Sequence, residues 1–236
     1  MGESSPVFTD IHCHILPGVD DGSPDIDTSL KMLEYEQNEG VGRIYLTPHY
    51  VYKRNRYRYS GLDEIFEEFK EICSGYFPDI ELHLGNEILY EPGIPERLKA
   101  GKIHTMGEGR FILTEFYTSV TLKEMLKSLR EYTDCGYKVI IAHVERYGRL
   151  YGNTDAIEEL LRYGALLQCN TQSILSGALD MEGRWARKLM RQDYISFLAT
   201  DAHDTDKRRP IYRKALEWVK TKCSEQTAFR ILHPVI

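Results

Sequence analysis

The sequence has few of the features that mark secreted, membrane-spanning or nucleic-acid-binding proteins. It contains no run of about 18 consecutive apolar residues, so no transmembrane helix is expected. Residues 1–6 do not combine a basic region with a following apolar stretch, so they do not predict a secretory signal. Basic residues are in deficit, with 30 Lys and Arg against 36 Asp and Glu, whereas a general nucleic-acid-binding surface is usually basic. We therefore expect no nucleic-acid partner and no membrane insertion.

Cysteine is also scarce and is not arranged in pairs. The chain has five cysteines, an odd number, and none of them form a Cys-x-x-Cys motif. Scattered cysteines of this kind are typical of reduced thiols rather than of a disulfide framework. A cytoplasmic location is therefore expected.

What the sequence does contain is a regular alternation of short apolar runs and longer amphipathic stretches. The apolar runs cover residues 7–11, 43–47, 80–84, 110–113, 138–142, 165–168 and 195–199. Helical periodicity marks residues 25–39, 62–74, 122–134, 155–163, 183–191 and 210–222, with a shorter helix near 96–100. Alternating strands and helices predict a parallel sheet with helices outside it. Seven units suit an α/β fold of the distorted (β/α)7, TIM-like barrel type, and no internal linker divides residues 1–236, so a single domain is expected.

The first apolar run ends in a His-x-His motif. Residues two apart in a strand face the same way, so His12 and His14 point together and Cys13 points to the other face. Two imidazoles on one side of a strand end supply half of a metal site. An isolated pair is as often a set of hydrogen-bonded polar side chains, so the remaining strand ends decide between these interpretations.

In a parallel barrel, functional sites form where the strands end and the following loops begin. Five of the eight histidines fall at such ends, and carboxylates accompany them. The candidate ligands are His12, His14, Asp21, His49, Glu87, Glu115, His143, Asp201 and His203. A His/Asp/Glu set without cysteine suits Mn, Fe or Zn, and nine groups exceed what one or two ions need, so three divalent ions with shared carboxylates are expected. Taken singly, a Glu after a strand also suits a first helical turn, and Asp201 also suits an N-cap.

The motifs at these ends resemble one known family. The motifs His-x-His, Thr-Pro-His-Tyr at 47–50, Gly-Asn-Glu at 85–87, His-x-Glu-Arg-Tyr at 143–147 and Asp-x-His at 201–203 resemble the PHP (polymerase and histidinol phosphatase) superfamily. The Gly-Val-Asp-Asp-Gly segment at 18–22 resembles its bacterial tyrosine-protein phosphatase branch, which serves capsular and extracellular polysaccharide systems. The similarity runs from the first strand to Pro210. It implies a distorted (β/α)7 barrel and a trinuclear cluster, commonly of manganese, with Fe or Zn as alternatives.

The resemblance also implies a distribution of the ligands among three ions. The first ion would be held by His12, His14, Glu87 and Asp201, the second by Glu87, Glu115 and His143, and the third by Asp21, His49 and His203. Asp20 takes the place of Asp21 if the register slips by one residue. Arg146 and Arg209 would bind the phosphoryl oxygens; Arg209 is preferred to Arg208 because it directly precedes Pro210.

The function implied is a metal-dependent protein-tyrosine phosphatase. Divalent ions at the barrel mouth would attract a phosphate dianion, and metal-activated hydroxide would attack it. The expected partner is the phosphotyrosine-containing tail of a bacterial tyrosine kinase that regulates polysaccharide synthesis or export. A covalent cysteine mechanism is not expected, because none of the five cysteines is followed six positions later by the Arg of a phosphate loop.

Three other functions remain open from the sequence. The first is a small-molecule phosphatase of the histidinol-phosphatase type, or another metal-dependent phosphoesterase; the Asp-Asp-Gly turn favours the tyrosine phosphatase over it. The second is an amidohydrolase, which often has a carboxylated Lys at a middle strand end; no Lys occupies such a place here. The third is a regulatory module without metals, which would be expected to have lost ligands. His83, His104 and His233 are not expected to bind metal.

One further segment, residues 50–59, is rich in Tyr, Lys and Arg although the protein as a whole is acidic. It is either a solvated run of charges or a basic, aromatic flap beside the site that attracts an anionic ligand.

Overall fold

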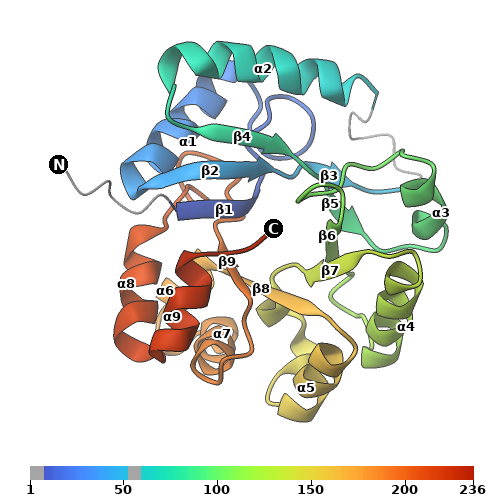
Figure 1. The fold of residues 1–236 in the computed structure, drawn as a ribbon. Coiled ribbons are helices and arrows are strands. Elements are labelled where there is room, and N and C mark those ends of the chain that lie inside the picture. Colours follow the sequence, from blue (N-terminus) through green and yellow to red (C-terminus); the bar gives the residue numbers. More distant parts are fainter. Residues whose placement is uncertain (1–7, 53–59) are drawn as a thin grey trace.

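The computed structural model describes residues 8–52 and 60–236. Figure 1 shows the strands arranged as a ring with the helices outside it. The basic part of the expected flap, residues 53–59, lies outside the described residues, so the flap stays a prediction. Within the described ranges, no helix has both the length and the apolarity needed to cross a membrane.

The strands of the ring are all paired in parallel. They are β1 (Phe8–Cys13), β2 (Val41–Leu46), β3 (His49–Tyr50), β4 (Glu81–Leu84), β5 (Glu87–Leu89), β6 (Phe111–Glu115), β7 (Lys138–Ile141), β8 (Leu166–Asn170) and β9 (Phe197–Ala199). Hydrogen bonds connect them in the orders β1-β2-β4 and β3-β5-β6-β7-β8-β9. All seven expected apolar runs are therefore strands, and β3 and β5 are additional.

The two additional strands extend β2 and β4 after a short break. The backbone ladder continues across the break, since Gly85 N–H donates to the Leu46 carbonyl at 2.9 Å and Glu87 N–H to the Thr47 carbonyl at 3.3 Å. Pro48 cannot donate a ladder hydrogen bond, which interrupts the first of these strands. At the second break the chain passes close to a side chain, because a Cβ on Gly85 would lie 2.7 Å from Met106 Cγ.

The ring closes between β1 and the segment after β9. His14 N–H donates to the Ala202 carbonyl at 2.8 Å, and Asp201 N–H donates to the His12 carbonyl at 2.7 Å. Counting β2 with β3 and β4 with β5, the nine described strands occupy seven positions around the barrel. The predicted distorted (β/α)7 barrel is confirmed.

The helices cover the outside of this barrel. They are α1 (Ile26–Glu39), α2 (Leu62–Tyr76), α3 (Ile94–Lys99), α4 (Leu122–Thr133), α5 (Thr154–Arg162), α6 (Thr171–Leu175), α7 (Met181–Arg191), α8 (Arg213–Lys222) and α9 (Glu225–Leu232). The sequence analysis anticipates all but α6 and α9. With five residues, α6 is too short to show a helical period. The helix expected from residue 210 begins only at Arg213, beyond Pro210.

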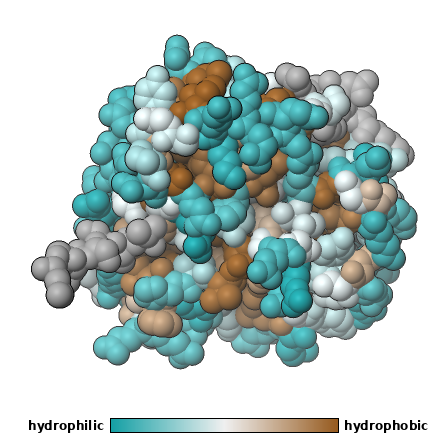
Figure 2. Space-filling model, turned by 45° about the horizontal axis from the view of Figure 1, so that its top comes forward, coloured by the Kyte–Doolittle hydropathy of each residue, from teal (hydrophilic) through white to brown (hydrophobic). Residues whose placement is uncertain are grey.

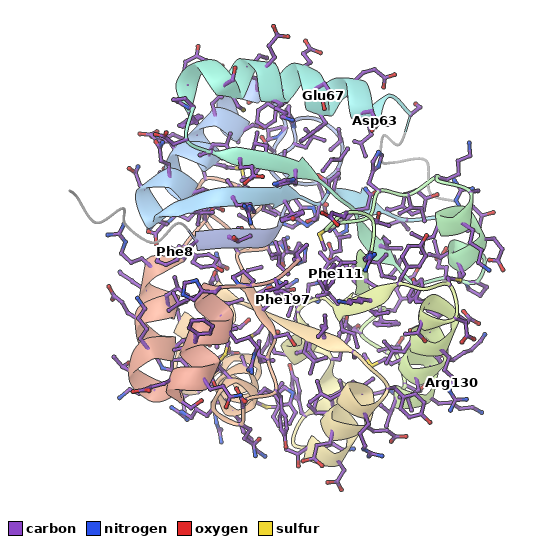
Figure 3. The ribbon with its side chains drawn as sticks, in the orientation of Figure 1. Phe8, Asp63, Glu67, Phe111, Arg130 and Phe197 are labelled. Carbon is purple, nitrogen blue, oxygen red and sulfur yellow. The ribbon has the colours of Figure 1, made fainter. Side chains whose placement is uncertain are left out.

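Side chains fill the barrel from its amino-terminal side. A buried apolar cluster that includes Ile11, Leu113, Ile140, Phe111 and Phe197 occupies this interior. Figure 3 shows Phe111 and Phe197 inside the ring, whereas Glu67 and Arg130 project outward from their helices. A larger cluster lies between the strands and the helices. On the surface, Figure 2 shows hydrophilic residues over most of one face of the molecule. The carboxyl ends of the strands are thus the part of the barrel left for polar side chains.

Candidate metal centre

The nine predicted ligands converge at the carboxyl ends of the barrel strands. Three groups of side chains have ligand atoms within 4.8 Å of one another: His12, His14 and Glu87; His49, Glu87 and Glu115; and His14, His49 and His203. Each of the other three predicted ligands, Asp21, His143 and Asp201, lies within 4.0 Å of at least one of these residues. Side chains from widely separated parts of the chain therefore form one cluster.

Glu87 lies at the middle of this cluster. Its Oε2 atom is 3.3 Å from Nε2 of both His12 and His14 and 3.0 Å from His49 Nδ1. Its Oε1 atom is 2.8 Å from His143 Nε2. Because two oxygens of one buried carboxylate face four imidazoles, Glu87 has the geometry of a bridging ligand.

Glu87 and His49 owe this placement to the two short strands. The sequence analysis expects both residues in loops that follow strands, but the structure places them on β5 and β3, where they pair directly opposite each other. The reason is that β2 and β4 resume after their breaks, which the apolar pattern does not reveal.

A second group lies beside the first. Asp21 Oδ1 is 3.4 Å from His49 Nε2 and 4.0 Å from His203 Nε2, and the His203 and His14 ring centroids are 3.9 Å apart. Asp20 is turned away from this group. It accepts hydrogen bonds from His14 Nδ1 at 2.7 Å and from the His49 backbone N–H at 2.9 Å, so it orients His14 while Asp21 faces the cluster.

The imidazole nitrogens that face away from the cluster show, by their hydrogen bonds, whether the cluster can hold a cation. His14 Nδ1 donates to Asp20, and His203 Nδ1 donates to the Asp201 carbonyl at 3.0 Å. His12 Nδ1 lies 3.1 Å from Gln168 Oε1. With the proton on Nδ1, each ring directs the lone pair of Nε2 into the cluster, and the Nε2 atoms of His12 and His14 are 3.2 Å apart. Facing lone pairs among carboxylates fit a divalent cation.

Burial and charge shift the pKa values of these groups in opposite directions. Burial opposes ionisation of Glu87 and Asp201, but the surrounding imidazoles hold the pKa of both carboxyls well below its usual value. Burial likewise opposes protonation of His14, yet Asp20, Asp201 and Glu87 raise its pKa well above the ordinary value. Burial and the positive charge of His14 lower the pKa of His203 to about 2.

These shifts predict that cations and protons compete for the cluster. Despite burial, Glu87 raises the pKa of His12 and raises that of His49 to about 10. The protein without metal therefore holds a proton on His49 at neutral pH, and a cation must displace it. We expect proton release on Mn²⁺ binding at pH 7 that declines as the pH rises toward about 10. Calorimetric titrations in buffers of different ionisation enthalpy measure it, and release independent of pH would contradict the shifts.

Two of the predicted ligands have an unusual backbone conformation. His143 has a φ of 33° and Asp201 a φ of 51°, and both residues are buried. The left-handed region is uncommon for residues other than glycine, and such conformations concentrate at functional sites. The barrel therefore holds these two side chains at positions that regular strand geometry would not give.

The structure separates the arginines that the sequence places near the site. Arg146 Nη1 is 2.8 Å from Asp201 Oδ2, and Arg208 Nη2 is 2.9 Å from Asp201 Oδ1. Arg209, which the sequence analysis prefers, is exposed and lines a surface hollow with Glu39 and Lys214. Arg208 lies in a turn and its side chain reaches Asp201, whereas Arg209 follows the turn and is exposed.

Two side chains that contact the predicted ligands receive no role from the sequence, although Asn170 stands just after the sixth apolar run. Gln168 and Asn170 lie two apart on β8 and face the cluster, where Gln168 meets His12 and Asn170 meets Asp201. The signal was present, since two amides in alternation within an apolar strand repeat the pattern of His12 and His14.

The remaining histidines lie in other environments. His83 stacks on Tyr45 with 4.7 Å between ring centroids, His104 contacts Asp63, and His233 lies 4.7 Å from the Phe229 ring.

Comparisons with known proteins agree with this geometry. The chain matches the family model described as "Capsular polysaccharide synthesis, CpsB/CapC" over residues 8–234. It is 30% identical over 214 residues to the tyrosine-protein phosphatase CpsB of Streptococcus agalactiae, covering 87% of each chain. It is 31% identical over 209 residues to the putative tyrosine-protein phosphatase CapC of Staphylococcus aureus, covering 89% of this chain and 82% of that one.

A solved structure shares the fold. It belongs to a study of YwqE from Bacillus subtilis and CpsB from Streptococcus pneumoniae, described as unique metal-dependent tyrosine phosphatases. The TM-score is 0.86 at 23% identity, over 94% of this chain and 90% of that chain.

Proposed function

This chain belongs to the CpsB/CapC family of capsular polysaccharide synthesis, and we propose on that basis that it hydrolyses phosphotyrosine in proteins with divalent cations held by the cluster. The observation that carries this proposal is the convergence of imidazole lone pairs and carboxylates on one point, with two guanidinium groups beside it. The resemblance to tyrosine phosphatases of the PHP type is confirmed by the family match and by the relatives named above.

We propose that the cluster holds three cations. We assign the first cation to His12, His14, Glu87 and Asp201, the second to Glu87, Glu115 and His143, and the third to Asp21, His49 and His203. Contacts of 2.8 Å between His143 and Glu87 and of 3.4 Å between His49 and Asp21 support this assignment, in which the first two cations share Glu87. His49 also lies 3.0 Å from Glu87, so it borders the second group as well. Ligands of this type suit Mn²⁺, with Fe or Zn as alternatives.

The chain's own residues would hold the phosphoryl group and balance its charge. When bound, the cations supply Lewis acidity and a hydrolytic nucleophile at neutral pH. Arg146 and Arg208 flank Asp201 from two sides, so their guanidinium groups lie where they can donate charge-assisted hydrogen bonds to phosphoryl oxygens. Phenolate is a good leaving group, since the pKa of tyrosine is about 10, and this reduces the need for a strong general acid.

The substrate we propose is the tyrosine-phosphorylated tail of a bacterial kinase that regulates polysaccharide synthesis or export. Membership of a capsular polysaccharide synthesis family supports this assignment. All five cysteines lie among the described residues and are free, which supports action in the reducing cytoplasm. We also propose that residues 1–236 act as a single domain.

A comparison of two substrates tests the proposal against its nearest rival. For the Mn²⁺-loaded protein we expect kcat/KM for a tyrosine phosphopeptide to exceed that for histidinol phosphate by about a hundredfold, the scale that a few specific contacts give. Exhaustive chelation is expected to remove both activities, and added Mn²⁺ to restore them. Preference for histidinol phosphate would favour the small-molecule phosphatase, and activity that survives chelation would contradict the metal-dependent mechanism.

A further inference from the structure

Two amide side chains on β8 lie between three of the candidate ligands. Gln168 and Asn170 are buried, with exposed fractions of 0% and 2%. Gln168 contacts His12 and the backbone of His143, and Asn170 contacts Asp201.

The hydrogen bonds of these amides run in one direction only. The backbone N–H of His143 is a donor by its chemistry, and it donates to Gln168 Oε1 at 2.8 Å. This identifies Oε1 as the acceptor, so Gln168 Nε2 is the donor to Asn170 Oδ1 at 2.8 Å. Asn170 Nδ2 is then the donor to Asp201 Oδ2, also at 2.8 Å.

The direction of this chain determines how both of its ends face the cluster. Because Gln168 Oε1 is an acceptor, His12 must place its proton on Nδ1, and its Nε2 lone pair then points at the cluster. At the other end, Asn170 and Arg146 both donate to Asp201 Oδ2. Oδ1 of Asp201 lies 3.5 Å from Nε2 of both His12 and His14, and it also pairs with Arg208 Nη2 at 2.9 Å.

We propose that Gln168 and Asn170 form an amide relay that fixes the tautomer of His12 and the orientation of Asp201, and thereby sets the affinity of the centre for divalent cations. They are positioning residues, because they act through ligands rather than on the substrate. The inference rests on the proposed function, since it assumes that His12 and Asp201 bind the same cation. Partners in the outer shell of metal sites typically change metal affinity by about 10–100-fold.

The alternative is that each amide only satisfies buried polar groups locally. The two interpretations differ in whether Gln168 and Asn170 are coupled. In a relay, removing Gln168 already frees Asn170 to turn, so removing Asn170 as well costs little more. Two independent local contacts would instead give effects that multiply, because distant or unconnected sites are additive in free energy.

The experiment measures Mn²⁺ dissociation constants by calorimetry for four variants of the full chain. These are Gln168→Met, Asn170→Ala, their combination, and the control Gln192→Met, which is exposed at the end of α7. We expect weakening of about 10–100-fold for Gln168→Met and about tenfold for Asn170→Ala, in the range seen for outer-shell partners. The double variant should bind within about twofold of Gln168→Met, and the control should match the wild type.

Thermal melting of each protein without metal shows whether a variant is folded. If Gln168→Met does not fold, Asn170→Ala decides the question alone, because it removes both the contact with Asp201 and the acceptor of the Gln168 hydrogen bond. Folded single variants that bind Mn²⁺ as tightly as the wild type would overturn the relay, and so would fully multiplicative losses in the double variant. A wild-type protein that binds no divalent cation would contradict both the proposed function and the relay. Failure of the relay alone would instead leave Mn²⁺ binding by the wild type intact, so the two outcomes can be told apart.

Discussion

Glu87→Gln is expected to eliminate measurable phosphotyrosine hydrolysis while leaving the barrel folded. The substitution keeps the size of the side chain but removes a negative charge that faces the imidazoles of His12, His14, His49 and His143. An amide cannot bridge two cations, so the loss of turnover should exceed the about 100-fold that an outer-shell partner typically costs. Steady-state kinetics on a phosphopeptide, with metal content measured on the same sample, give the result.

Glu81→Gln is the matched control for this prediction. Glu81 lies on β4, and its half-exposed side chain pairs with Arg43 at 2.8 Å. It is close to Glu87 in the sequence but is not one of the predicted ligands. Exposed ion pairs contribute about 0–1 kcal/mol, so this variant should retain wild-type turnover. A Glu87→Gln protein that keeps its bound metal and its activity would remove Glu87 from the centre of the mechanism.

Arg208→Ala and Arg209→Ala are expected to behave very differently, although the residues are neighbours. Arg208 reaches Asp201, whereas Arg209 lines an outer hollow beside Lys214. Loss of hydrogen bonds to a charged group costs about 1.5–3 kcal/mol, so kcat/KM for the phosphopeptide should fall by about tenfold to 100-fold in Arg208→Ala. Arg209→Ala should remain within about twofold of the wild type, as surface substitutions usually do.

This pair also distinguishes phosphate binding from overall charge. Both variants lose one positive charge from the same loop, so a general electrostatic effect on the substrate would weaken both equally. Equal losses would therefore contradict a direct role for Arg208. A larger loss of kcat/KM in Arg209→Ala than in Arg208→Ala would instead favour Arg209 as the residue that binds the phosphoryl group, as its position before Pro210 suggests.

The sequence was sufficient to predict both the barrel and the end of it at which the predicted ligands lie, because both follow from the topology. In a parallel barrel every strand ends on the same side, so residues at strand ends are neighbours however far apart they lie in the chain. This is why His14 and His203 could be placed together before their contact was known. The apolar runs that mark the strands are a local signal, so they can be recognised in the sequence without knowing how the strands pack.

Features that depend on how side chains turn could not be predicted in this way. The breaks before His49 and Glu87 arise where β2 and β4 lose and regain pairing, which leaves no periodic trace. The choice between Arg208 and Arg209 depends on which of two adjacent side chains faces inward. The amides of β8 became visible as partners of the ligands only through their hydrogen bonds, although their alternation was present in the sequence.

The left-handed backbone at His143 and Asp201 has a consequence for the way this protein would respond to laboratory evolution. Conformations of this kind cost on the order of 1–3 kcal/mol each in residues other than glycine. A library of variants selected for thermal stability alone should therefore become enriched in glycine at both positions. The selected variants would be more stable than the wild type but inactive. Glycine should be enriched at positions 143 and 201 under this selection and should be lost again once turnover is also required. That result would show that stability and activity place opposite demands on these two residues.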